Sequence, residues 1–285
     1  MPESPFQRHD RVFEDFQYCY PVISRRSYGL SIGINLSLRK ECNFDCPYCQ
    51  IDRTAEARRS QFIDLTILEK ELLTLISSAL SGELFTHERF KGTDEYYKVL
   101  RDVALSGDGE PTTSKYFDSV SEIALRVIGE YRDREILIKP VVITNGSMLH
   151  KPEIKRTLYR MSELDGGPWV KLDASNPTEF KRVAETKIPF EKILENILQY
   201  SKEKSTVLQT ILYKYPDETE SFEPESMLNL LRNFLERGAK FEYLQLYTLA
   251  RSTKIKDLKP VSKTRLEDVA ILLREGTGIK IGVYP

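Results

Sequence analysis

The stretch LSIGINLSLRKECNFDCPYC, residues 30–49, joins the two features that decide how this chain is interpreted. Its first part, LSIGINL from Leu30 to Leu36, is an apolar segment that predicts a β-strand. Three cysteines follow within eight residues, namely Cys42, Cys46 and Cys49. Reactive side chains directly after a strand are typical of α/β enzymes, in which the loops at the carboxyl ends of parallel strands carry the chemistry.

Outward from this stretch, short apolar segments alternate with longer segments of helical period. The predicted strands are residues 30–36, 99–106, 140–144, 169–174, 206–213, 241–250 and 279–284. The first helix contains Thr66 and Glu69, which are spaced as in a capping box, and Gly82 marks its predicted end. Six βα units and a last strand predict an α/β fold, a partial (β/α)6 TIM-like barrel over residues 30–285, preceded by an N-terminal arm over residues 1–29.

Composition limits the classes of function. The chain has 285 residues, Lys+Arg 42 and Asp+Glu 43, and a net charge of -1, so no overall charge favours nucleic acid or an anionic membrane. No apolar run reaches the roughly 18 residues of a membrane-spanning helix, and the first residues are charged where a signal peptide is apolar. We therefore expect a cytoplasmic protein without a membrane partner.

The cysteine cluster points to a metal. The spacing C-x-x-x-C-x-x-C gives three thiolates on one loop, whereas an iron–sulfur cubane normally has four, so one iron would lack a protein ligand. A structural zinc site is the alternative, with Cys19, His87 or His150 as its fourth ligand. Cys19 stands apart from the cluster, and its simplest interpretation is a buried structural thiol.

The motif CNFDCPYC resembles the C-x-x-x-C-x-aromatic-C signature of the radical S-adenosylmethionine (SAM) superfamily. The resemblance extends over roughly residues 20–285, through PVISRRSYGLSIGIN, QIDRT, SGDGEPTT, VVITNGSML, VKLDAS and LQLYTLAR in that order. Together these segments look like the branch of radical SAM iron–sulfur oxidoreductases related to the tRNA wyosine-forming, 4-demethylwyosine synthase-like enzymes.

This resemblance implies a chemistry and its cofactors. A [4Fe-4S] cluster would be held by Cys42, Cys46 and Cys49, and its open iron would bind SAM. Reductive cleavage of SAM would give a 5′-deoxyadenosyl radical that abstracts hydrogen from an unidentified substrate. A flavodoxin or ferredoxin is the expected electron donor.

The resemblance also implies the contacts with SAM. Tyr48 would lie near the adenine, and the segment Gly107, Asp108, Gly109 and Glu110 would meet the ammonium group. Thr144, Asn145 and Asp173 lie at the ends of predicted strands and are candidates for the ribose or the methionine carboxylate. Two simpler alternatives stay open: Asn145 and Gly146 are a common turn pair, and Asp173 is suited to cap the next helix.

Polar residues on apolar strands are further candidates. Gln209, Gln245 and Tyr247 need partners inside the barrel, so we expect them to line a substrate or cofactor cavity. Arg251 is a candidate for binding an anionic substrate group.

The number of cysteines distinguishes this chain from the wyosine-forming enzymes that it resembles. Wyosine-forming enzymes carry a second cluster on further cysteines, and only Cys19 is left here. The substrate class therefore stays open between a nucleic-acid base, a small molecule and a protein. Activation of a glycyl-radical partner protein is one alternative, and a non-catalytic zinc-binding or interaction module is an alternative of another class.

Overall fold

The computed structural model describes residues 11–53, 62–251 and 253–285. The chain divides into two compact units along its length. Unit 1 consists of residues 1–41, 56–143 and 156–167, and unit 2 consists of residues 42–55, 144–155 and 168–285. The cysteine cluster therefore belongs to unit 2, whereas the GDGEP segment belongs to unit 1.

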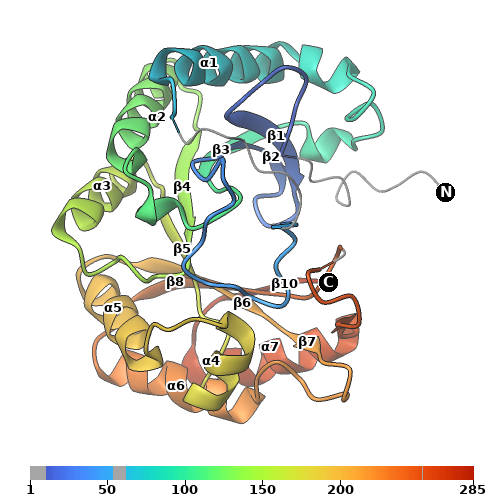
Figure 1. Cartoon of the computed structure of the whole chain (residues 1–285), viewed down its shortest axis with the longest axis vertical. Helices are drawn as coiled ribbons and strands as arrows, with labels where there is room; N and C mark the ends of the chain where they lie inside the picture. The colour runs from blue at the N-terminus through green and yellow to red at the C-terminus, as the bar shows by residue number, and fades with distance from the viewer. Residues whose placement is uncertain (1–10, 54–61, 252) are drawn as a thin grey trace. The chain divides into compact units, whose positions relative to one another are not determined.

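Unit 1 is built on parallel strands with one antiparallel addition (Figure 1). Strand β2 pairs with β3 and β3 with β4 in parallel, and β1 pairs antiparallel with β2. Helix α1 packs on β1, β2 and β3 and against α2. The elements, with β4 and α3 crossing the unit boundaries, are β1 Cys19–Ser24, β2 Gly29–Ile34, α1 Leu65–Ser81, η1 Glu83–Thr86, η2 Glu95–Tyr97, β3 Leu100–Leu105, η3 Pro111–Thr113, α2 Phe117–Arg132, β4 Lys139–Thr144 and α3 Pro152–Ser162.

Unit 2 continues the same pattern. Strand β5 pairs with β6, β6 with β8 and β8 with β10, all in parallel, and β7 and β9 form a small antiparallel pair. Helix α6 packs against α7, which lies on β8 and β10. The elements are β5 Gly167–Lys171, α4 Pro177–Ala184, α5 Phe190–Glu203, β6 Thr206–Ile211, β7 Tyr213–Lys214, α6 Pro224–Glu236, β8 Phe241–Tyr247, β9 Lys259–Pro260, α7 Lys263–Thr277 and β10 Ile281–Tyr284.

The predicted α/β class with largely parallel strands is confirmed. The predicted strands coincide with β2, β3, β4, β5, β6, β8 and β10, and a helix lies in each of the six predicted helical segments. Across the described chain, no helix combines the length and the apolar character that crossing a membrane requires.

Strand β1 lies inside the segment that the sequence predicted only as an arm. This strand was not predicted because it contains Pro21. Proline lacks the N–H that a central strand needs, although it is tolerated on an edge strand. In the described part of unit 1, β1 pairs with β2 alone, so the missing N–H breaks no ladder. The division into an arm over residues 1–29 and a barrel over residues 30–285 stays a prediction.

The start of α1 corrects one local expectation. The predicted capping box placed Thr66 at the N-cap, but Asp64 holds that position, and its carboxylate accepts hydrogen bonds from the backbone N–H groups of Thr66 and Ile67. Aspartate is as good an N-cap as threonine, and the earlier start adds Leu65 to the helix. The predicted end at Gly82 is confirmed, because this residue forms the C-cap with φ +82°.

Glu71 on α1 anchors the start of β1 and gives a first testable prediction. Its buried carboxylate accepts hydrogen bonds from the backbone N–H groups of Gln17, Tyr18 and Cys19, at 2.6, 2.9 and 3.0 Å. Glu71→Ala removes the carboxylate that accepts all three hydrogen bonds and should lower the free energy of unfolding by about 3 kcal/mol in urea denaturation. Glu69→Gln is the matched control on the same helix and should leave the urea midpoint nearly unchanged. Equal midpoints for the two variants would contradict the anchoring role.

Candidate functional site

The cysteine loop, residues 42–53, lies in unit 2. Cys42, Cys46 and Cys49 are of intermediate exposure, and none of the three is in a disulfide. The backbone N–H of Cys49 donates to the carbonyl of Cys46 at 3.0 Å, which turns the loop at the C-x-x-C segment. Arg53 at the end of the loop donates to the sulfur of Cys49 at 3.8 Å.

The first half of the loop is held by segments before and after β5. Asn145, directly after β4, donates from Nδ2 to Oδ1 of Asn43 at 2.7 Å, and Asn43 donates to the hydroxyl of Ser147 at 2.8 Å. At the end of α4, the carbonyl of Ala184 accepts from the N–H of Asp45 at 3.0 Å. These contacts span more than 100 residues of sequence and give the loop a fixed path.

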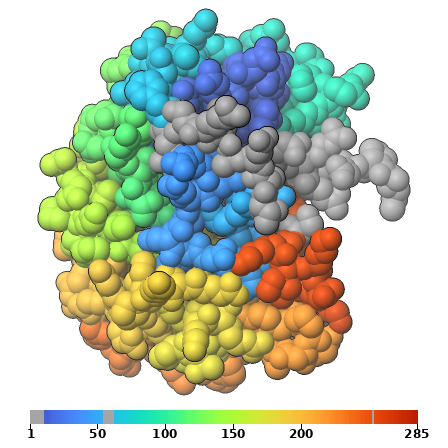
Figure 2. All heavy atoms as spheres, in the orientation of Figure 1, coloured from blue at the N-terminus to red at the C-terminus, as the bar shows by residue number. Residues whose placement is uncertain are grey.

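The second half of the loop is held by the segment that follows β8. The N–H of Lys254 donates to the carbonyl of Cys49 at 2.8 Å, and the N–H of Ile255 donates to the carbonyl of Pro47 at 3.2 Å. The ammonium of Lys254 also forms an ion pair with Asp45 at 2.7 Å. In Figure 2, blue atoms of the loop lie next to the yellow atoms of α4 and the orange-red atoms of this segment.

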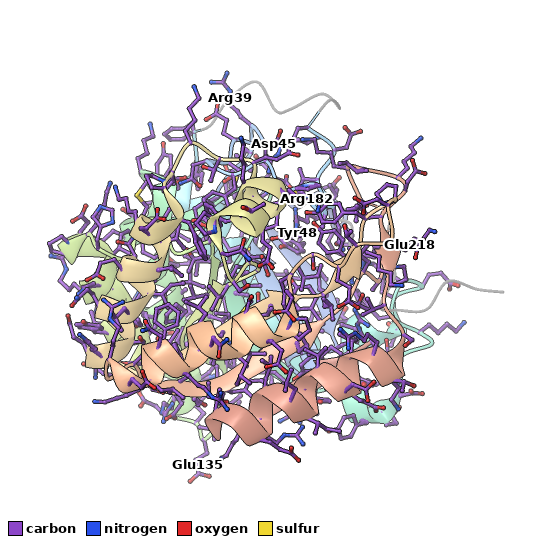
Figure 3. The ribbon with its side chains drawn as sticks, turned by 90° about the horizontal axis from the view of Figure 1, so that it is seen from below. Arg39, Asp45, Tyr48, Glu135, Arg182 and Glu218 are labelled. Atoms are coloured by element: carbon purple, nitrogen blue, oxygen red, sulfur yellow. The ribbon has the colours of Figure 1, made fainter. Side chains whose placement is uncertain are left out.

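Tyr48 connects the loop to β5 and β8. Its hydroxyl donates to Oδ2 of Asp173 at 2.5 Å, and Oδ1 of the same carboxylate accepts from the N–H of Ile211 at 3.0 Å. Lys171 pairs with Asp173 at 3.1 Å and donates to the hydroxyl of Tyr247. The ammonium also lies 4.9 and 5.0 Å from the ring centres of Tyr48 and Tyr247. Figure 3 labels Tyr48 and Asp45 on the loop.

Burial and charge shift the pKa values of this cluster in a consistent direction. Burial and the neighbouring Asp173 carboxylate raise the pKa of Tyr48, so its phenol stays protonated and remains a donor. Burial alone would lower the pKa of Lys171, but Asp173 and Tyr247 outweigh it and raise that pKa, so the side chain is a cation. Burial raises the pKa of the Cys46 thiol to about 12, so binding of a metal there releases a proton.

Asp173 therefore does not cap the following helix. Asn176 is the N-cap of α4 and accepts from the N–H of Glu179 at 3.0 Å, while Asp173 faces Tyr48 and Lys171. The side chain of Asp173 is only 8% exposed, and that of Lys171 is 19% exposed. The two form a sheltered ion pair at the end of β5.

The side chains of Thr144 and Asn145 stabilise the turn that follows β4. The hydroxyl of Thr144 accepts from the N–H of Gly146 at 3.1 Å, and the side chain of Asn145 accepts from the N–H of Ser147 at 3.0 Å. Gly146 has φ +77°, so the simpler interpretation of Asn145 and Gly146 as a turn pair is correct. The Asn145 side chain does more than form the turn, because it also binds Asn43 of the cysteine loop.

The GDGEP segment of unit 1 fits closely against residues 35–41. A Cβ atom on Gly109 would lie 1.9 Å from the carbonyl oxygen of Glu41, and one on Gly107 would lie 2.3 Å from Oδ1 of Asn35. Asp108 pairs with Arg11 at 2.7 Å and accepts from Asn35 at 2.8 Å. Both glycines are therefore required by the close packing of this segment against residues 35–41.

Glu110 is buried at the end of this segment. Its carboxylate accepts from the N–H and the hydroxyl of Thr112, at 3.1 and 2.6 Å, and so caps η3. These two bonds use Oε1 alone. The predicted roles of Gly107, Asp108, Gly109 and Glu110 toward SAM remain predictions.

Three residues that matter at the site were not predicted from the sequence. Asn43 and Lys254 hold the loop, and Lys171 pairs with Asp173. Lys171 carried a signal, since a lysine inside the apolar strand WVKLDA must find a partner, as was argued for Gln209. Gln209 has a partner in Gln245, whose Oε1 accepts from its Nε2 at 2.7 Å, and the expectation that these residues line a cavity stays a prediction. Arg251 donates to Oε1 of Gln50, next to the last cysteine, at 3.2 Å.

The loop suits a cubane by its donor chemistry. Within the described residues, no three His, Cys, Asp or Glu side chains converge on one point as a single-ion site requires. A [4Fe-4S] cluster does not need that convergence, because each of its thiolates binds a different iron. The three cysteines of this one held loop, none of them in a disulfide, are the thiolate donors that such a cluster uses.

Comparison with solved structures defines the class of fold. The chain is similar to TYW1 with a lysine-pyruvate adduct bound, with a TM-score of 0.52 and 20% identity over 88% of this chain and 74% of that one. It is also similar to HydG, a maturase of the [FeFe]-hydrogenase, with a TM-score of 0.54 and 13% identity over 90% of this chain and 52% of that one. Both are radical SAM enzymes, so the predicted partial TIM-like barrel is confirmed and the resemblance holds at the level of the fold.

The relatives found by sequence share about a quarter of their residues with this chain and do not define its function. The chain is 25% identical over 221 residues to a UPF0026 protein of Helicobacter pylori J99, which covers 76% of this chain and 61% of that protein. It is 23% identical over 268 residues to the GTPase Obg of Brachyspira hyodysenteriae, over 92% of this chain but 34% of that protein. The chain thus spans less than two thirds of the length of these relatives. No family model matches it.

Proposed function

We propose that this chain is a radical SAM enzyme in which Cys42, Cys46 and Cys49 hold a [4Fe-4S] cluster. The observation that carries the proposal is the cysteine loop: three cysteines, none in a disulfide, on a segment fixed by backbone hydrogen bonds to residues 184, 254 and 255. A loop held in this way has its ligands positioned before the metal arrives. When bound, the cluster would supply the electron for reductive cleavage of SAM.

The chain's own residues would then bind and orient SAM. Tyr48 offers a ring fixed at both ends, by its backbone in the loop and by its hydroxyl on Asp173. Asn145 keeps the loop against the end of β4. Of the GDGEP segment, Glu110 is the residue we propose to meet the ammonium, because a carboxylate attracts an ammonium group. Thr144 and Asp173 remain candidates for the ribose or carboxylate.

The surroundings of the proposed enzyme follow from this chemistry. We propose a cytoplasmic protein that receives electrons from a flavodoxin or ferredoxin, with an organic substrate whose C–H bond is broken. TYW1, a structure with the same fold, has a lysine-pyruvate adduct bound, and in this chain the ammonium of Lys171 lies 4.9 Å from the centre of the Tyr48 ring on the loop. Its pairing with Asp173 keeps it protonated, which suits a charge-bearing role better than adduct formation.

Anaerobic reconstitution tests the proposal. Incubation with iron and sulfide should load about four irons per chain, and dithionite should then release 5′-deoxyadenosine from SAM. Omitting dithionite is the control and should give no release. Stoichiometric zinc with no cleavage of SAM would instead support the alternative of a non-catalytic zinc-binding module.

A further inference from the structure

Arg53 ends the cysteine loop and contacts its last cysteine. Nη2 of Arg53 donates to Sγ of Cys49 at 3.8 Å. The arginine follows Cys49 by four residues, so both belong to the same held loop. Its side chain is 25% exposed, so the guanidinium is sheltered from water but not sealed from it. A cation therefore faces one of the three sulfurs of the motif.

Asp45 orients the guanidinium of Arg53. Nε of Arg53 lies 3.7 Å from Oδ1 of Asp45, whereas Oδ2 of the same carboxylate pairs with Lys254 at 2.7 Å. Asp45 thus uses a different oxygen for each cation. One nitrogen of Arg53 is directed to Asp45 and another to Cys49. Groups in this position, in contact with a ligand rather than with the metal, tune the properties of metal sites.

Arginine is well suited to this position. Its guanidinium stays protonated at any working pH, and its planar fork donates in more than one direction. Lys171 also lies near the loop, 4.9 Å from the centre of the Tyr48 ring, but Asp173 at 3.1 Å balances its charge, and it donates to the hydroxyl of Tyr247. Arg53, in contrast, donates directly to a cysteine sulfur.

We infer that Arg53 raises the reduction potential of a cluster bound through Cys49 and so helps it to accept an electron. Three thiolates make such a cluster anionic, and reduction adds a further negative charge, which a cationic N–H donor at the sulfur stabilises. One electron passes from a reductant of the flavodoxin or ferredoxin class, no bond forms or breaks, and the guanidinium keeps its proton. The inference rests on the proposed function, because it concerns the cluster proposed there.

A purely structural role of Arg53 would have different consequences. If the residue only held the loop through Asp45, its loss would lower the iron content and leave the potential of the remaining clusters unchanged. If its charge acts on Cys49, its loss lowers the potential while most of the iron stays bound. The loop keeps its path in that case, because Lys254 still pairs with Asp45 and the carbonyls of Pro47 and Cys49 keep their backbone partners.

A redox titration of the anaerobically reconstituted full chain tests the inference, without SAM and followed by electron paramagnetic resonance of the reduced cluster. Arg53→Met removes the charge but keeps a long side chain. We expect about tenfold less reduced cluster at a given potential in this variant, a fall of about 59 mV for a one-electron couple. Arg53→Lys restores the charge without the planar fork and should lie between the two. Arg237→Met, the control, removes an arginine that pairs with Glu195 in the same unit and should leave the potential unchanged.

A second measurement tests the contact itself. With nitrogen-15 in the arginines, spin-echo spectroscopy of the reduced cluster should show a nitrogen coupling in the wild type that Arg53→Met lacks. Absence of this coupling from the wild type, equal potentials in the wild type and Arg53→Met, or loss of most of the iron from Arg53→Met would overturn the inference. A wild-type chain that binds no cluster refutes the proposed function itself, whereas a loaded chain whose potential does not depend on Arg53 refutes only the role of this residue.

Discussion

The Cys46→Ala variant should lose both its bound iron after reconstitution and its dithionite-dependent cleavage of SAM. Cys46 is the middle ligand of the motif, and its neighbours are already committed elsewhere: Tyr48 to Asp173 and Asp45 to Lys254. Neither of these two neighbours can move into its place without breaking these contacts. Because a direct ligand is lost, the decrease should exceed the roughly 10–100-fold that follows loss of an outer hydrogen-bond partner.

Cys19→Ala is the matched control for this experiment. Cys19 is buried in β1 of unit 1, where its thiol lies 3.8 Å from the carbonyl of Leu68. Burial raises the pKa of this thiol well above its ordinary value, so it is a poor ligand. Iron content and cleavage should be unchanged in this variant. Wild-type iron content and cleavage in Cys46→Ala would refute the cluster assignment.

The second large effect is expected at Asp173. Asp173→Asn keeps the shape of the side chain but removes the charge that balances Lys171, so a largely buried cation is left without its partner. Loss of one partner from a buried ion pair is strongly destabilising, and we expect about 3 kcal/mol from urea denaturation. The hydrogen bond from Tyr48 also weakens, so reconstituted iron content should fall as well.

A double variant shows whether the pairing causes this loss. Lys171→Met together with Asp173→Asn removes the unbalanced charge and should recover a large part of the lost stability. Asp268→Asn on the exposed side of α7 should leave the urea midpoint unchanged. If the double variant is less stable than Asp173→Asn alone, Lys171 contributes something other than pairing.

The sequence predicted the framework of the fold because its strands and helices differ clearly in period. Leu68, Leu72 and Ile76 recur at helical spacing and are buried in α1. Strand β1 was missed because its proline, Pro21, argues against a strand, and α4 was missed because eight residues are too few to show a helical period clearly. Short helices and strands are stabilised mainly by tertiary packing, which the local pattern of apolar residues does not reveal.

The candidate site was predictable only in part for the same reason. The cysteines were evident from their spacing, and Asp173 from its place at a strand end. That Tyr48 binds Asp173, or that Asn43 binds Asn145, depends on contacts between residues more than 100 positions apart. The glycines of the GDGEP segment were correctly singled out, but the close neighbour they admit is residues 35–41 of the chain itself.

The contacts between the cysteine loop and the segment after β8 have a consequence for biosynthesis. Lys254 follows Asp45 by 209 positions, and at about 5–20 residues per second the ribosome needs roughly 10–40 s to cover that distance. During that time the three thiols of the nascent chain lie on a loop that has not yet formed its contacts with Lys254 and Ile255. Oxidation or capture of stray metal during translation is therefore most damaging in this interval, and stable insertion of a cluster is an event that follows completion of the chain.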